Sequence, residues 1–159
     1  MIALDTNVLV RLVVADDAAQ CAAASALVRR ARAEQARLFI ADVVVCELVW
    51  VLRSVYRMSR HEVAAAIDKL SAAAQAEFEA PDRLTAAVAS FRDGRGDFAD
   101  YLIREHARGG DADFVATFDQ ALLDEPGFVH PDPGGWGPET TLHEDPPAYG
   151  RRGRRPRRG

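Results

Sequence analysis

Short apolar runs alternate with longer helix-forming segments along most of the chain. The runs typical of strands lie at residues 2–4, 38–41, 77–80, 114–117 and 128–129. The segments between them carry helix-start signals, such as the capping-box spacing of Ser59 and Glu62 and a helix-initiating proline at position 81. Strands that alternate with helices are typical of a parallel sheet covered on both faces. The pattern therefore predicts an α/β fold of three layers, with a central parallel sheet flanked by helices.

This pattern stops near residue 131, where Pro, Gly and charged residues replace the periodic segments. The last nine residues hold six arginines and no acid. We expect one domain over residues 1–130 and a disordered tail over residues 131–159. The basic end of this tail either adds phosphate contacts to a nucleic acid or is a solvated extension.

Composition narrows the function classes. The 159 residues are 48% hydrophobic, which is enough for one domain with a sizeable core. Without the six arginines at the end, the chain has 14 basic and 24 acidic residues, and this balance suits a cation site better than nonspecific nucleic-acid binding.

No apolar run has membrane-spanning length and no signal segment opens the chain, so we expect a cytoplasmic protein. Cys21 and Cys46 match no metal-ligand spacing and are expected to be buried free thiols.

An acid follows the first apolar run. Asp5 comes directly after Leu4, at the predicted end of a strand. Ligands of parallel α/β sheets bind beyond the carboxyl ends of strands, so Asp5 is a candidate site residue. The alternative is a helix N-cap, because Asp, Thr and Asn all cap well and an apolar-periodic stretch follows.

Glu47 is the one polar residue between Val43 and Leu52, in a helix that we expect Asp42 to cap. Such an apolar helix is expected to be mostly buried. A buried carboxylate needs a partner or a metal ion, which favours a functional role. The alternative places Glu47 on a narrow exposed stripe near the helix start.

Two further acid positions complete the set. Asp97 and Asp100 share one face of a predicted helix, while Thr117 and Asp119 follow a predicted strand. Each of these acids has an alternative role in capping. Clustered carboxylates repel one another unless a cation neutralises them, and Mg²⁺ prefers such oxygen ligands. A site of this kind suits phosphodiester hydrolysis with one or two metal ions.

Four motifs carry a family resemblance. "LDTNVLVR", "ADVVVCELVWVLR", "DFADYLI" and "ATFDQAL" occur in this order. Together they resemble the PIN-domain ribonucleases, specifically the VapC-type toxins of type II toxin–antitoxin systems. The resemblance implies RNA cleavage that depends on Mg²⁺ or Mn²⁺, a homodimer, and inhibition by a cognate VapB-type antitoxin encoded beside the toxin. It also implies structured RNA targets such as tRNA or rRNA.

The resemblance assigns roles to individual residues. It implies that the four catalytic acids are Asp5, Glu47, Asp100 and Asp119. Of these, Asp5 and Asp100 match the direct metal ligands, while the other two complete the site through water or a second ion. The matching auxiliary positions are Thr6, Asn7, Asp97 and Thr117. Tyr101 departs from the family pattern, which has a small residue there, and is expected to narrow the groove beside the metal.

We therefore expect the toxic component of a toxin–antitoxin system, a metal-dependent endoribonuclease. The alternative is a catalytically silent PIN-like module that binds RNA or antitoxin. An aspartyl-phosphate phosphatase is disfavoured, because position 7 is Asn where those enzymes usually carry a second Asp. Several apolar residues in two predicted helices either form core or offer a surface to a second copy or an antitoxin: Trp50, Leu52, Val55, Ile67 and Leu70.

Overall fold

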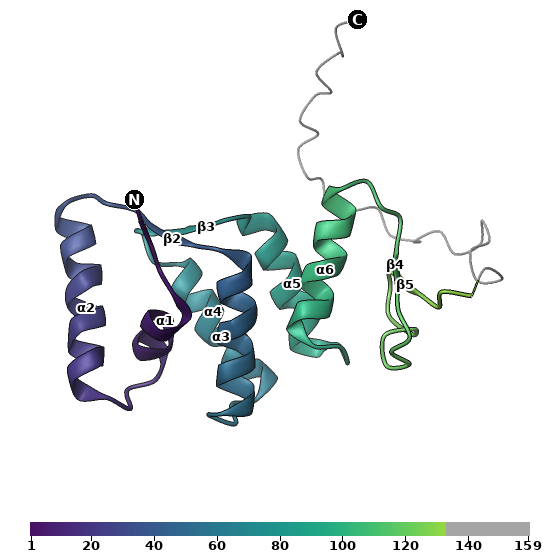
Figure 1. Cartoon of the computed structure of the whole chain (residues 1–159), viewed down its shortest axis with the longest axis horizontal. Helices are drawn as coiled ribbons and strands as arrows, with labels where there is room; N and C mark the ends of the chain where they lie inside the picture. Colours follow the sequence, from purple (N-terminus) through teal and green to yellow (C-terminus); the bar gives the residue numbers. More distant parts are fainter. Residues whose placement is uncertain (133–159) are drawn as a thin grey trace, which may run out of the picture.

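The computed structural model describes residues 1–132 of the chain (Figure 1). The predicted tail at 131–159 lies outside the described residues except for its first two positions. The elements in chain order are β1 (Ile2–Ala3), α1 (Thr6–Val13), α2 (Ala18–Ala33), β2 (Leu38–Ile40), α3 (Asp42–Ser54), α4 (Arg60–Ser71), β3 (Ala76–Phe78), α5 (Pro81–Asp93), α6 (Phe98–Gly109), β4 (Val115–Ala116) and β5 (Phe128–Val129). This alternation of strands and helices confirms the predicted α/β class.

Local signals set most helix starts. The Ser59 hydroxyl accepts from the Glu62 N–H, and the Glu62 carboxylate accepts from the Ser59 N–H at 2.7 Å, which forms the expected capping box of α4. Pro81 is the first residue of α5, where its missing N–H leaves no hydrogen bond unmade. The expected cap of α3 is wrong, because Ala41 is the N-cap residue and Asp42 already lies inside the helix.

The strands form two parallel sheets instead of one. In the first sheet, β2 lies between β1 and β3, with Ile2 opposite Leu38 and Leu38 opposite Ala76. The second sheet pairs β4 with β5, with Val115 opposite Phe128. Figure 1 shows the two sheets well apart along the long axis of the molecule. As a result β1 and β4 are each paired on one side only, and both residues of β1 are exposed.

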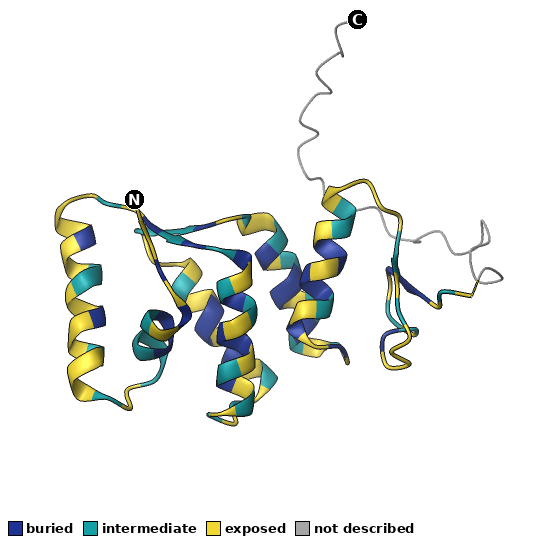
Figure 2. Ribbon diagram, in the orientation of Figure 1, coloured by how far each residue is buried: buried dark blue, intermediate teal, exposed yellow. Residues whose placement is uncertain are grey.

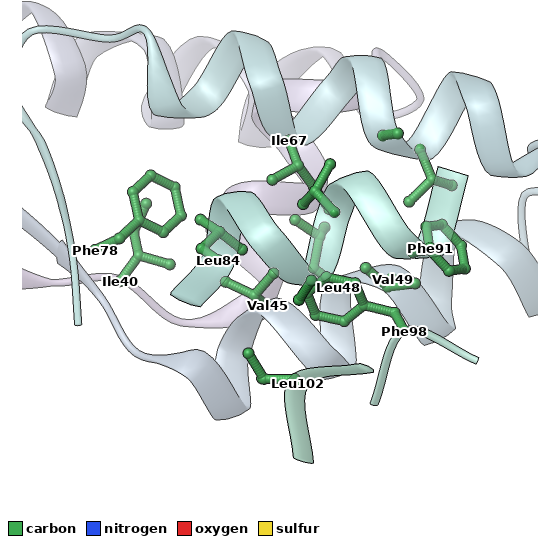
Figure 3. Close-up of a cluster of buried hydrophobic side chains, with 14 of the residues drawn as sticks. Ile40, Val45, Leu48, Val49, Ile67, Phe78, Leu84, Phe91, Phe98 and Leu102 are labelled. Atoms are coloured by element: carbon green, nitrogen blue, oxygen red, sulfur yellow. The ribbon is translucent and has the colours of Figure 1, made fainter. Parts of the chain in front are cut away.

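A common hydrophobic core joins the helices to the first sheet (Figure 3). Leu48 of α3, Ile67 of α4 and Phe91 of α5 are almost completely buried there. The ring of Phe91 meets that of Phe98 of α6 edge to face, with centroids 5.9 Å apart. For the apolar residues of α3 and α4, the sequence left open whether they form core or a surface for a partner. Leu52 is part of the core. Trp50 and Val55 are exposed instead.

α2 is the longest helix, with 16 residues, and Figure 2 shows most of its surface exposed. Its buried residues, Ala24 and Ala31, are small. Cys21 on α2 and Cys46 on α3 are free thiols, and both are half-buried, less buried than expected. Among residues 1–132, no helix combines the length and the hydropathy needed to cross a bilayer.

Buried polar contacts fasten the second sheet to α6. The Arg104 guanidinium is buried and binds the Pro126 carbonyl at 3.0 Å, the Ser90 hydroxyl at 2.6 Å and the Glu105 carboxylate at 3.0 Å. It also lies against the ring of Phe128 in β5. A buried ion pair with these additional hydrogen bonds has one favourable geometry, so it fixes the position of β5 relative to α6.

Candidate active site

Asp5 lies at a strand end and also caps a helix, so both of the alternatives for this residue are confirmed. It follows β1 and is also the N-cap residue of α1, with extended backbone angles and a carboxylate oxygen that accepts from the Asn7 N–H. The cap uses Oδ1, and the residue is exposed to solvent. Asn7 contributes this backbone N–H and is itself exposed.

Thr6 connects α1 to Glu47 on α3. The buried Thr6 hydroxyl donates to Glu47 Oε2 at 2.5 Å. α3 is buried on one face only, and Glu47 lies on its exposed face, as the alternative for this residue predicted. Its partner is therefore a hydroxyl that fixes its orientation.

Asp97 and Asp100 meet at the start of α6. Asp97 is the N-cap residue, and its N–H donates to Asp100 Oδ2 at 2.8 Å. Partial burial raises the pKa of the Asp100 carboxyl, and the negative charges of Asp97 and Asp119 raise it further, while the hydrogen bond from Asp97 opposes them. A cation beside Asp100 would relieve this unfavourable charge.

Asp119 belongs to a turn directly after β4. Its N–H donates to the Thr117 hydroxyl at 3.0 Å, and its Oδ1 accepts from the Ala121 N–H at 2.9 Å. The Thr117 N–H donates to the Val129 carbonyl at 2.9 Å, which ties this turn to β5. Thr117 thus supports the acid next to it, and the exposed Asp119 is close enough to affect the charge of Asp100.

The structure divides the expected acids into two groups. The first acid group contains Asp5 and Glu47, with Thr6 and Asn7. The second acid group contains Asp97, Asp100 and Asp119, with Thr117. In the described part of the chain, no three acid, His or Cys side chains lie close enough to hold one metal ion. The separation follows from the sheets, because β4 is not paired with β1. The donors of both groups are carboxylate oxygens, which fit Mg²⁺ or Mn²⁺ in chemistry.

A cluster of charged side chains around the buried Asp42 was not expected. Asp42 Oδ2 accepts from Arg83 Nη2 at 2.6 Å and from Arg83 Nε at 2.8 Å, and it lies 3.1 Å from His106 Nε2. The Asp42 N–H donates to Glu79 at 3.0 Å. The cluster joins the starts of α3 and α5 to the last turn of α6. Its partners are distant in sequence, so the sequence offered only the capping role for Asp42.

Tyr101 does not narrow a groove, which corrects the expectation for this departure from the family pattern. Its ring is completely buried and packs edge to face on Phe128, with centroids 6.3 Å apart. Its hydroxyl accepts from the Gly96 N–H at 2.9 Å and donates to the Glu125 carboxylate at 2.7 Å. Burial and the Glu125 contact raise the pKa of this phenol to about 12. Tyr101 is a structural residue that orders the loop before α6.

Comparison with known proteins identifies the family of the domain. The PIN domain model matches residues 2–127, which is most of the chain and includes every candidate acid. A search of curated proteins found no match. The acids at the ends of β1 and β4 and at the start of α6 lie within the matched region. The chain therefore belongs to the PIN-domain family, whose members are generally nucleases.

Proposed function

We propose that the protein is the toxic component of a type II toxin–antitoxin system, a cytoplasmic endoribonuclease that depends on Mg²⁺ or Mn²⁺. The observation that carries this proposal is the placement of carboxylates after two parallel strands and at a helix start, within a PIN domain. The order of the four motifs supports the VapC-type subgroup in particular.

We assign Asp5 and Asp100 as direct ligands of divalent ions, one in each acid group, and such ions would activate water and stabilise charge on the scissile phosphate. Glu47 is oriented by the Thr6 hydroxyl, so its carboxylate is available as an acceptor in a defined position. Asp119 is held by its turn and supplies a second acceptor. The raised pKa of Asp100 gives an electrostatic reason for a cation at the second acid group.

The partners follow from the same proposal. The substrate is a structured RNA such as tRNA or rRNA, whose exposed bases a protein can recognise. The antitoxin is of the VapB type and covers the acids, with an arginine side chain suited to pairing with them. A complex that is unaffected by neutralising both Asp5 and Asp100 would contradict this mode of inhibition.

The test is RNA cleavage by the purified protein. We expect cleavage with Mg²⁺, none after chelation, and a loss of at least about 100-fold in Asp5→Asn and Asp100→Asn, as for other groups that stabilise charge in a transition state. Asp68→Asn is the matched control, because Asp68 forms an exposed ion pair with Arg92 on α4 and α5. Full activity after chelation, or in the Asp5 variant, would contradict the proposal.

A second candidate is a catalytically silent module that binds RNA or an antitoxin. The separation of the acids into two groups within one chain is the observation that favours it. Calorimetry with Mn²⁺ distinguishes the two candidates. Binding that Asp100→Asn weakens supports the nuclease, whereas a protein that binds antitoxin but no divalent ion supports the silent module.

A further inference from the structure

The second acid group draws its carboxylates from separate elements. Asp100 is in the first turn of α6, whereas Asp119 is in the turn after β4. Two carboxylates repel each other, so other residues must hold the two segments together. The contacts that do so meet at the loop between α5 and α6, residues 94–97.

Tyr101 is at the centre of these contacts. It follows Asp100 on α6 and is completely buried. Its hydroxyl accepts from the Gly96 N–H at 2.9 Å and donates to the Glu125 carboxylate, both of whose oxygens lie 2.7 Å away. A phenol has a single proton to donate, so this hydroxyl uses its whole donor capacity on Glu125. One side chain therefore ties the loop before α6 to the segment after Asp119.

Glu125 belongs to the same run of turns as Asp119. The Leu122 N–H donates to the Asp119 carbonyl at 3.1 Å, and the Glu125 N–H donates to the Leu122 carbonyl at 2.9 Å. The Glu125 carboxylate also accepts from the Arg95 N–H at 2.5 Å. Glu125 thus fastens the turn of Asp119 both to Tyr101 and to the loop before α6.

Gly96 lets the two segments approach closely. A Cβ atom at this position would lie 2.3 Å from Leu122 Cδ2 and 3.4 Å from Asp100 Oδ2. The first distance is a clash with a side chain that is almost completely buried, so a larger residue would push the turn of Asp119 away from α6. Arg60 of α4 binds the Gly96 carbonyl at 2.5 Å and holds the loop in this position.

Tyr101 and Glu125 reach the acids only through the backbone. Tyr101 is the residue after Asp100, and Glu125 is joined to Asp119 by the two turn hydrogen bonds through Leu122. We propose that Tyr101 and Glu125 are positioning residues, which hold the turn of Asp119 against the start of α6 so that Asp100 and Asp119 can serve the same divalent cation. The inference rests on the proposed function, which supplies the cation. Removing residues that orient metal ligands typically lowers metal affinity by about 10–100-fold.

Hydrogen exchange followed by NMR tests the positioning without a metal ion. Tyr101→Phe keeps the buried ring but removes both hydrogen bonds of the hydroxyl. We expect the Leu122 N–H to exchange about fivefold faster in this variant, because the turn of Asp119 then opens locally. Ile67→Val, which deletes a buried methyl group of α4, is the control and should leave this N–H unchanged. The same change at every slowly exchanging amide of Tyr101→Phe would mark a general loss of stability and overturn the proposal.

Mn²⁺ affinity, measured by calorimetry, tests the link to the cation. At the site that Asp100→Asn weakens, Tyr101→Phe and Glu125→Leu should each lower the affinity by about 10-fold. Glu125→Gln loses the same charge as Glu125→Leu but keeps an acceptor oxygen for Tyr101 and Arg95, so it should retain most of the affinity. Ile67→Val should bind as the wild type does. Equal weakening in the Gln and Leu variants, or unchanged binding in Tyr101→Phe, would overturn the positioning role.

These outcomes are distinct from those that test the nuclease. If the wild type binds Mn²⁺ and Tyr101→Phe weakens this binding, but the wild type cleaves no RNA, only the proposed nuclease function fails and the positioning role stands. If the wild type cleaves RNA and Tyr101→Phe binds Mn²⁺ equally well, only the positioning role fails. No Mn²⁺ binding by the wild type would overturn both.

Discussion

The hydroxyl of Thr6 donates a 2.5 Å hydrogen bond to Glu47, 41 residues further along the chain. This contact joins the first turn of α1 to the middle of α3. It fixes a candidate catalytic carboxylate that would otherwise be an exposed and mobile side chain. The position of Glu47 thus depends on a residue beside the candidate metal ligand Asp5.

Removing this hydroxyl is expected to lower both activity and stability. Thr6→Val keeps the buried shape but loses the donor, so the free energy of unfolding should fall by about 1 kcal/mol. RNA cleavage should also fall, because Glu47 loses its orientation. Urea unfolding and a cleavage assay measure the two effects. Thr6→Ser retains the donor and should restore most of the activity, and equal activity in the Val and Ser variants would contradict the positioning role.

The Asp100 carboxyl is expected to titrate above the ordinary range of an aspartate, because its pKa is raised by burial and by nearby charges. Asp119→Asn removes one of these charges and should lower the Asp100 pKa. Carbon-detected NMR titration of the side-chain carboxyl measures this shift. Asp68→Asn on the exposed surface of α4 is the control and should leave the Asp100 titration unchanged.

The buried carboxylate of Asp42 makes Arg83 a stability determinant. Arg83→Met leaves Asp42 without its main partner, which should cost roughly 3 kcal/mol in the free energy of unfolding. Adding Asp42→Asn to this variant removes the uncompensated charge and should recover part of the loss. Urea unfolding of the two variants provides the comparison, and a loss below about 0.5 kcal/mol in Arg83→Met would show that the pair carries little stability.

The buried phenol of Tyr101 predicts a loss of stability at high pH. Its pKa is raised from 10.0 to about 12 in the folded protein, so folding favours the protonated form. That contribution is complete below pH 10 and is lost as the pH rises towards 12. Unfolding followed between these pH values should show a smaller decline in Tyr101→Phe. Spectrophotometric titration should also show one tyrosine with late ionisation in the folded protein.

The sequence predicted those parts of the fold that depend on neighbouring residues. The capping box of Ser59 and Glu62 and the start of α5 at Pro81 need only local geometry, and the structure confirms both. The four motifs predicted the PIN-domain family, and the domain match confirmed it. The division into two sheets was not predictable in this way, because strand pairing depends on distant segments.

In the candidate site too, the sequence predicted local features but not contacts between distant segments. Sequence position placed Asp5 after a strand and Asp97 and Asp100 at a helix start, as the structure shows. It could not show that Glu47 lies on the exposed face of α3, because an almost wholly apolar helix gives no clear polar stripe. The prediction for Tyr101 was wrong because its contacts are with Glu125 and Phe128, which lie more than 20 residues further along the chain.

The candidate acids also accept hydrogen bonds from the backbone. Asp5 accepts from an N–H at the start of α1, Asp119 from one in the turn after β4, and Asp100 from the Asp97 N–H. Asparagine keeps an acceptor oxygen for these hydrogen bonds but loses the charge. Alanine loses both. In a homologue that has lost nuclease activity but retains the fold, we therefore expect asparagine at these three positions. Asparagine at these positions would identify inactive homologues from their sequence.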